Sequence, residues 1–207
     1  MFTIIISMTI FALIGAISPG PVNIIATGAG ANYGFMRALP FVLGTTISYT
    51  LVVFLVGIGL NAVLETYPQI TRSLQYIGGA FLLYMSYKIA MAKPITASQQ
   101  QETELTALQT PPSFIHGFLA QSLNPKAWLV SMSGVSLFVS TNSPASFYLL
   151  IFCVISFSCC FFGVGTWAMI GQLISSFLSN QKRQRLFNLI MGLLLSITVL
   201  FIITAKL

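Results

Sequence analysis

Charged side chains are scarce in this sequence, and aspartate is missing altogether. Charged residues make up 6% of the 207 positions and hydrophobic residues 56%, whereas about a quarter of a soluble domain is charged. Four long ranges carry no charge: Met1–Met36, Ala38–Leu64, Ser73–Tyr87 and Ala127–Gln181. Several of them reach the roughly 20 apolar residues that a membrane-spanning helix needs. The composition therefore excludes an ordinary soluble domain and predicts an all-α membrane protein.

Cysteine and other metal-binding residues are also few. The three cysteines, Cys153, Cys159 and Cys160, lie in one apolar segment without CxxC spacing. Cysteines of this kind are more often packing residues than metal ligands or redox pairs. The chain has no glycine-rich nucleotide-binding loop, no GxSxG and no HExxH, so neither ATP-driven transport nor a familiar intramembrane hydrolase is supported. We expect no cofactor and no metal site.

The long apolar ranges predict six membrane-spanning helices. A cluster of turn-forming residues at Ser140–Ser146, "STNSPAS", separates two of these helices within the last uncharged range. The one long polar segment, Pro94–Ser113, divides the chain into two halves of three helices. The helices are expected near Thr3–Ala29, Arg37–Leu60, Thr71–Ala92, Phe114–Val135, Ala145–Gln172 and Arg185–Ala205.

The distribution of basic residues predicts the orientation of these helices. With six spans both termini lie on one side of the membrane, where the connectors hold Arg72 and Lys206. Because basic residues concentrate in cytoplasmic connectors, we expect both termini outside the cell. The same pattern accounts for the net charge of +6, so we expect no nucleic acid as a partner. The connectors on the opposite, cytoplasmic side hold six basic residues, namely Arg37, Lys88, Lys93, Lys182, Arg183 and Arg185.

Each half contains a proline-containing break in its first helix. The first half has "ISPGPVNIIATG" at Ile17–Gly28, and the second has "SLNPKAW" at Ser122–Trp128. Three spans per half make the second half enter the membrane in the opposite sense, which predicts an inverted repeat. The expected unit is one transmembrane domain over residues 1–207, with repeat 1 at about 1–93, a cytoplasmic loop at about 94–113 and repeat 2 at about 114–207.

The two breaks supply the candidate binding residues. Paired discontinuous helices frequently mark the binding site of a transporter. Lys126 is the only cation predicted well inside a span, and it either contacts an anionic group of a ligand or reaches back to the membrane surface. Asn23 and Asn124 either bind a ligand or cap freed backbone groups. The full set of candidate substrate-binding residues is Pro19, Gly20, Pro21, Asn23, Asn124, Pro125 and Lys126.

No carboxylate is predicted in the middle of the membrane. Glu65 lies near an outer span end, and Glu102 and Glu104 lie in the long loop. A cationic group of a ligand would then need exposed backbone carbonyls, hydroxyls such as those of Thr45 and Thr46, or the face of Tyr49 or Trp167. For each of these two aromatic residues, packing is the more common role.

These motifs resemble those of the LysE/RhtB amino-acid exporters of bacteria. "SPGPVNIIATGAGANYGFMRAL" and "GFLAQSLNPKAW" are the segments most similar to that family. The resemblance covers nearly the whole chain and implies export of amino acids across the cytoplasmic membrane, driven by the proton gradient. Val22 departs from the family, which usually has Asp or Asn directly after PGP. "PVNIIA" together with "NYGF" is most similar to the branch that exports cysteine and O-acetylserine.

The sequence thus predicts a secondary exporter of a small neutral amino acid or derivative, and not an enzyme. The expected partners are that amino acid and membrane lipid, with a homodimer left open. One alternative is a passive channel. A second is a membrane thiol oxidoreductase, which would need paired cysteines on different helices, whereas all three cysteines here belong to one predicted helix.

Overall fold

The computed structural model describes residues 1–60, 66, 68–92, 111–178 and 180–204, and every regular element in these ranges is a helix. This agrees with the predicted all-α class. Short irregular turns follow α3, α7 and α8: η1 (Val56–Leu60), η3 (Val135–Val139) and η4 (Ser176–Leu178). The α-helices are α1 (Phe2–Ile17), α2 (Pro21–Tyr33), α3 (Phe35–Leu55), α5 (Pro68–Ala90), α6 (Phe114–Ser122), α7 (Pro125–Gly134), α8 (Ala145–Ser175) and α9 (Gln181–Thr204).

The helices are long and apolar enough for a membrane. Among the described residues, Phe35–Gly59, Ala145–Leu178 and Gln181–Leu200 each qualify as a span, and the bent pair α1 and α2 makes a fourth if it is counted as one span. Large apolar side chains cover the outside of the bundle, such as Phe162 and Leu173, which are 68% and 66% exposed. Soluble monomers rarely expose extended apolar surfaces, so lipid is the solvent that fits this surface.

The first predicted break lies between α1 and α2, whose axes differ by 62°. Gly20 is fully extended there, with φ −171° and ψ 175°, and Pro21 occupies the first turn of α2. Proline is tolerated at this position because its missing N–H would have no partner within the helix. The break predicted at "SPGP" is confirmed.

The second predicted break lies between α6 and α7. The helix ends at Ser122 and resumes at Pro125, with Asn124 in an extended conformation at φ −87° and ψ 110°. Pro125 again opens the new helix. Both prolines therefore start a helical segment after an interruption, and the predicted break at "LNPK" is confirmed.

Glycines bring two pairs of helices into backbone contact. A Cβ added to Gly30 of α2 would lie 1.9 Å from the carbonyl oxygen of Ala168 in α8. A Cβ on Gly171 would lie 2.1 Å from the carbonyl oxygen of Thr27. A Cβ added to Gly44 of α3 would lie 2.0 Å from the carbonyl oxygen of Phe114 in α6. These distances leave no room for a side chain, so glycine sets the separation of the helices.

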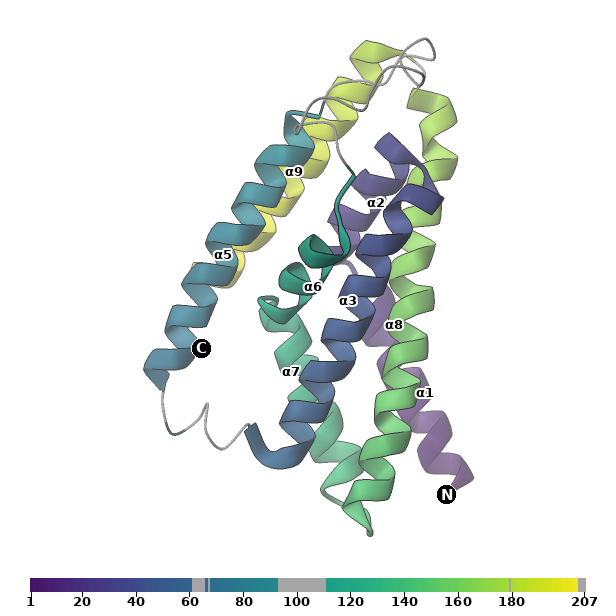
Figure 1. The fold of residues 1–207 in the computed structure, drawn as a ribbon, viewed down its shortest axis with the longest axis vertical. Coiled ribbons are helices and arrows are strands. Elements are labelled where there is room, and N and C mark those ends of the chain that lie inside the picture. Colours follow the sequence, from purple (N-terminus) through teal and green to yellow (C-terminus); the bar gives the residue numbers. More distant parts are fainter. Residues whose placement is uncertain (61–65, 67, 93–110, 179, 205–207) are drawn as a thin grey trace.

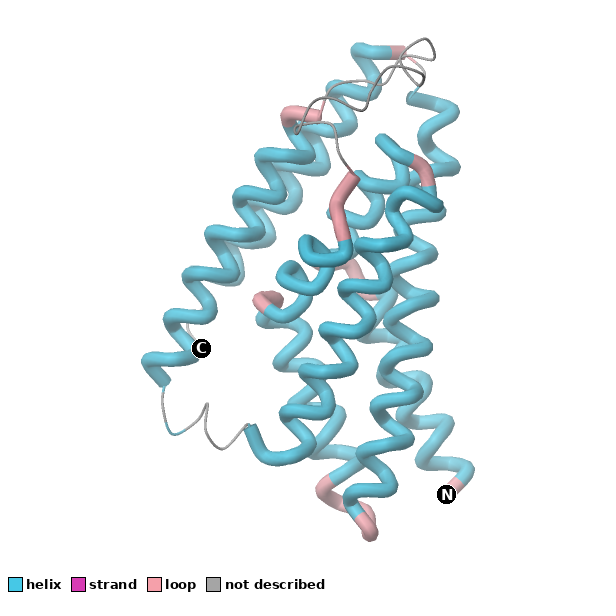
Figure 2. The backbone as a smooth tube through the Cα atoms, in the orientation of Figure 1, coloured by secondary structure: helices cyan, strands magenta, loops and turns pink. Residues whose placement is uncertain are grey.

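The helices run between two ends of an elongated bundle (Figure 1). The N-terminus and the turn before α8 lie at one end, and the junctions of α2 with α3 and of α8 with α9 lie at the other. Helices α5 and α9 pack side by side (Figure 2). The loop predicted at about 94–113 falls almost entirely outside the described residues. The arrangement of six spans as inverted repeats stays a prediction.

Candidate functional site

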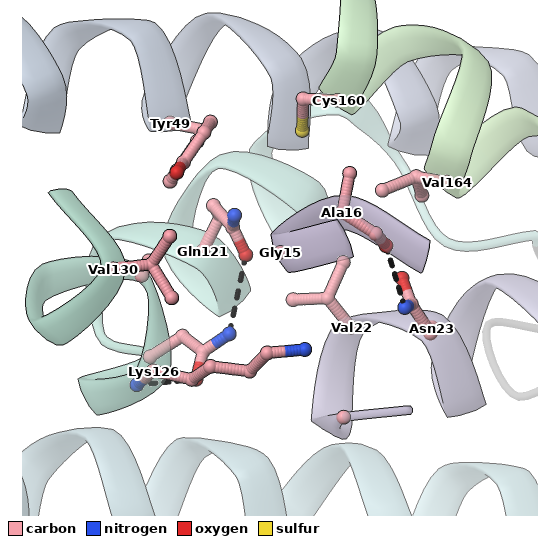
Figure 3. A pocket seen from close by; sticks show the side chains of 13 residues that line it. Gly15, Ala16, Val22, Asn23, Tyr49, Gln121, Lys126, Val130, Cys160 and Val164 are labelled. Carbon is pink, nitrogen blue, oxygen red and sulfur yellow. Dashed lines mark hydrogen bonds between the residues drawn. The ribbon is translucent and has the colours of Figure 1, made fainter. Parts of the chain in front are cut away.

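The two helix breaks meet at one small cavity, shown in Figure 3 and called here the break pocket. Its volume is about 30 Å³, which is room for a water molecule or two. Four of the seven candidate residues line it: Gly20 and Asn23 from the first break, and Asn124 and Lys126 from the second. The structure therefore brings together residues that are about a hundred positions apart in the sequence.

Lys126 joins the two breaks directly. It is the second residue of α7, and its Nζ donates a hydrogen bond to the carbonyl oxygen of Ser18 at 2.6 Å and a longer one to that of Pro19 at 3.4 Å. The last carbonyls of a helix have no partner within it and carry partial negative charge. The lysine ammonium thus neutralises the end of α1. The partners that Lys126 Nζ has among the described residues are these two backbone carbonyls of the first break.

The remaining carbonyls at the end of α1 are also bound by side chains. Asn23 Nδ2 donates to the carbonyl oxygens of Ala16 and Ser18, each at 3.0 Å. Trp167 of α8 donates through Nε1 to the carbonyl oxygen of Ile17 at 3.0 Å. Unsatisfied backbone groups cost several kcal/mol each in a membrane interior. Asn23 therefore caps freed backbone, one of the two roles predicted for it.

The second break is capped by its own residues. The Asn124 side chain accepts a hydrogen bond from the backbone N–H of Lys126 at 3.2 Å, and its Nδ2 donates to Gln121 Oε1 at 3.3 Å. Trp128 Nε1 donates to the carbonyl oxygen of Ser122 at 2.7 Å. Asn124 thus fills the N-cap position that asparagine favours, and it lies on the pocket wall at the same time.

The three candidate prolines do not line the pocket and instead shape the two breaks. Pro19 contributes a carbonyl oxygen to Lys126, and Pro21 and Pro125 open α2 and α7 without lining the pocket. Gly20 is the close neighbour of the lysine: a Cβ there would lie 3.3 Å from both Cδ and Nζ of Lys126. The glycine leaves room for the lysine side chain to cross the first break.

Part of the pocket wall consists of residues that were not among the predicted candidates. Gln121 was not a candidate, although a glutamine close before "LNPK" is an unusual polar residue in a predicted span. The sequence predicts a packing role for Cys160 and favours one for Tyr49. Both residues line the pocket, as does Val22. Thr45 and Thr46 were considered as ligands for a cation.

The structure gives these two hydroxyls a different role. The hydroxyl groups of Thr45 and Thr46 both donate to the carbonyl oxygen of Val42 in their own helix, each at 2.8 Å. Neither residue lines the break pocket. The carbonyl oxygens of Ser18 and Pro19 remain as the acceptors nearest to Lys126.

The pocket offers one cation and several neutral polar groups. An ammonium group donates three hydrogen bonds and accepts none. Two of those of Lys126 go to the Ser18 and Pro19 carbonyls, so it can bind a carboxylate with its third N–H, and with a second one if it releases the Ser18 carbonyl. That carbonyl, once released, can accept a hydrogen bond from an amine. Among the described residues, no group of three or more His, Cys, Asp or Glu side chains that could hold a metal was found.

Apolar helices with paired breaks around a half-buried lysine define a class of protein, the membrane transporters built on discontinuous helices. Comparison with known proteins gives the family. The profile of the LysE type translocators matches residues 13–205, and the chain belongs to this family. It is therefore a transporter and not an enzyme.

Relatives with similar lengths support this assignment. A cysteine/O-acetylserine efflux protein of Escherichia coli O157:H7 is 28% identical over 196 residues, which cover 93% of this chain and 94% of the relative. The protein of the same name from Salmonella typhimurium is 29% identical over 187 residues, covering 89% and 90%. No solved structure matches the chain.

Proposed function

We propose that this protein is a secondary transporter that exports a small neutral amino acid, or a derivative of one, across the bacterial cytoplasmic membrane. The relatives described above are named for efflux of cysteine and O-acetylserine, so these two compounds are the first to test. The proton gradient is the proposed driving force, because the sequence has no nucleotide-binding motif.

The observation that carries the proposal is the bond between Lys126 and the Ser18 carbonyl, which links the two breaks. An amino acid has both of the groups that this pair can bind. Its carboxylate would replace the carbonyl as partner of Lys126, and its ammonium would bind the carbonyl that is released. Charge-assisted hydrogen bonds of this kind are about twice as strong as neutral ones.

The charge of the pocket supports a neutral substrate. Lys126 balances one carboxylate, and the described residues that line the pocket include no acidic side chain that would balance a second cation. The sequence contains no aspartate and only three glutamates. A dibasic amino acid would therefore bring a charge without a partner into the membrane, at a cost of about 2.5–3.5 kcal/mol on insertion scales.

The proposed mechanism is alternating access of two inverted halves. The break pocket is too small for an amino acid as it stands, because small-molecule sites usually measure about 300–1,000 Å³. Substrate would thus enter when the halves separate on one side of the membrane. The end of the bundle that holds the α2–α3 and α8–α9 junctions (Figure 1) also holds Arg37, Lys182 and Arg185, which supports a cytoplasmic position for it.

Transport by the purified protein in liposomes tests the proposal. We expect saturable uptake of [35S]cysteine or O-[14C]acetylserine that an imposed proton gradient drives and a protonophore abolishes. A parallel screen measures whether overproduction protects cells from toxic amino acids and analogues. If no amino acid is transported and no compound is tolerated better, the proposed function is wrong.

The same liposomes separate the two alternatives. A passive channel would give flux that does not saturate with substrate and does not follow the proton gradient. A thiol oxidoreductase would depend on Cys153, Cys159 and Cys160, which are free thiols on α8. We expect a variant with all three changed to alanine to keep saturable transport, whereas an oxidoreductase would lose its activity.

A further inference from the structure

A second and much larger cavity opens at the end of the bundle where α2 meets α3 and α8 approaches α9. Its volume is about 640 Å³, which falls within the range of small-molecule sites. We call it the vestibule. Its polar wall comes from four helices and consists of Asn32, Arg37, Gln172, Ser175 and Gln184.

The vestibule lies on the same pair of helices as the break pocket. On α2, Asn23 lines the pocket and Ala31 lines the vestibule. On α8, Val164 lines the pocket and Gln172 lines the vestibule. Both steps are eight residues in the same chain direction, which corresponds to roughly 12 Å along a helix. The two cavities are therefore successive chambers between α2 and α8.

The backbone contact between α2 and α8 separates the chambers. Gly30 lies against the carbonyl of Ala168, and Gly171 lies against the carbonyl of Thr27, with no space for a Cβ at either place. All four positions fall between the pocket residues and the outer vestibule residues along their helices. Separation of α2 from α8 at these glycines would connect the vestibule to the break pocket.

Charge and hydrogen bonding make the vestibule suited to an anionic group. Arg37 is exposed on its wall, and none of the described residues that line it is acidic. The amides around it are held in place: Gln172 Oε1 accepts from the backbone N–H of Phe35 at 2.5 Å, and Gln184 Nε2 donates to Asn32 Oδ1 at 3.3 Å. The guanidinium is thus a charged group facing fixed neutral neighbours, and its planar fork matches a carboxylate.

We propose that the vestibule is the first binding site for the exported amino acid, where Arg37 binds its carboxylate before the compound reaches Lys126. This inference rests on the function proposed above. The carboxamide oxygens of Gln172 and Gln184 are the groups positioned to bind its ammonium, because Asn32 Oδ1 already accepts from Gln184 and Asn188. Two cations in successive chambers then bind the same carboxylate in turn.

Kinetics on the cytoplasmic face test the vestibule. Uptake of O-[14C]acetylserine or [35S]cysteine is measured in inverted membrane vesicles, whose outer surface is the cytoplasmic face. We expect Arg37→Gln to raise KM about fivefold with little change in the maximal rate, as the loss of one partly exposed ion pair implies. Arg37→Lys should restore most of the affinity. Lys182→Gln is the matched control, because Lys182 lies at the same end but does not line the vestibule.

The outcomes distinguish this site from the proposed function. Saturable transport with an unchanged KM in Arg37→Gln, or the same rise in Lys182→Gln, overturns the vestibule site and leaves the function standing. No saturable transport by the unaltered protein overturns both. An anionic lipid headgroup offers a similar charge, so the assay is repeated in liposomes of phosphatidylcholine with and without phosphatidylglycerol. A KM effect that needs phosphatidylglycerol assigns Arg37 to lipid and overturns the proposal.

Discussion

At the scale of the residue, Lys126 combines a structural and a binding role. Its ammonium lies half-buried against the Ser18 carbonyl and takes the place that water would otherwise fill. A lysine in a membrane interior is tolerated only when such partners are present. Because the partner is an uncharged carbonyl, a carboxylate can compete for the same ammonium with a stronger bond, in which both partners are charged.

Replacement of this lysine should therefore slow transport strongly. We expect Lys126→Ala to reduce the initial rate of uptake into liposomes by about ten- to a hundredfold, the equivalent of one hydrogen bond to a charged group at about 1.5–3 kcal/mol. Size-exclusion chromatography in detergent checks that the variant still folds. A rate close to that of the unaltered protein would remove Lys126 from the substrate site.

Gly20 gives a second prediction beside the lysine. A Cβ at this position would stand 3.3 Å from Cδ and Nζ of Lys126, so Gly20→Ala should push the flexible lysine off the Ser18 carbonyl without unfolding the protein. We expect a transport rate about tenfold lower, equivalent to about 1.4 kcal/mol. Gly165→Ala is the control, because the nearest atom to its Cβ, in Phe35, lies 3.9 Å away. Equal rates in the two variants would contradict the assigned packing of Gly20.

Several of these residues could be predicted because their effects are local. A proline interrupts its own helix, and an asparagine or lysine next to it in the chain must therefore lie at the same break. Gln121 escaped prediction, and Tyr49 was only a possible cation ligand, because their place on the pocket wall depends on how α6 and α3 pack against distant helices. The Ser18 carbonyl as partner of Lys126 escaped for the same reason, since no sequence pattern pairs a side chain with a distant backbone oxygen.

At the scale of the element, the contact between α2 and α8 controls whether the two chambers connect. Gly30 and Gly171 place the two backbones in direct contact, and small residues of this kind drive helix association in membranes by close packing. The interface buries no charge and no salt bridge among the described residues. The contact between α2 and α8 depends on close packing alone, and such a contact can open and close again.

Filling this contact should weaken it. We expect Gly30→Ala to lower the free energy of unfolding by about 1–3 kcal/mol, the usual cost of overpacking, because its Cβ would meet the Ala168 backbone at 1.9 Å. Gly28→Ala on the same helix is the matched control, since its Cβ would lie 3.5 Å from Ile89 in ordinary contact. The midpoint of thermal unfolding in detergent measures both, and a midpoint for Gly30→Ala as high as that of Gly28→Ala would refute the close packing.

At the scale of the whole molecule, the chain has two ends of different character. The α2–α3 and α8–α9 junctions, the vestibule and the cations Arg37, Lys182, Arg183 and Arg185 gather at one end, and the N-terminus and the turn before α8 lie at the other (Figure 1). The charge count in the sequence predicted this asymmetry. The vestibule itself was not predictable, because it forms where two helix junctions that are distant in the sequence, α2–α3 and α8–α9, come together.

Single cysteines placed at the two ends of α8 test the orientation of the whole molecule. In a background with the three native cysteines changed to alanine, Ser146→Cys lies in the first turn of α8, and Lys182→Cys lies just beyond its far end; both positions are exposed. With both termini outside the cell, an impermeant maleimide should label Ser146→Cys in intact cells. It should label Lys182→Cys only after the membrane is permeabilised, because basic connectors stay in the cytoplasm. The opposite pattern would place the vestibule outside the cell and overturn its role as the first binding site for an exported compound.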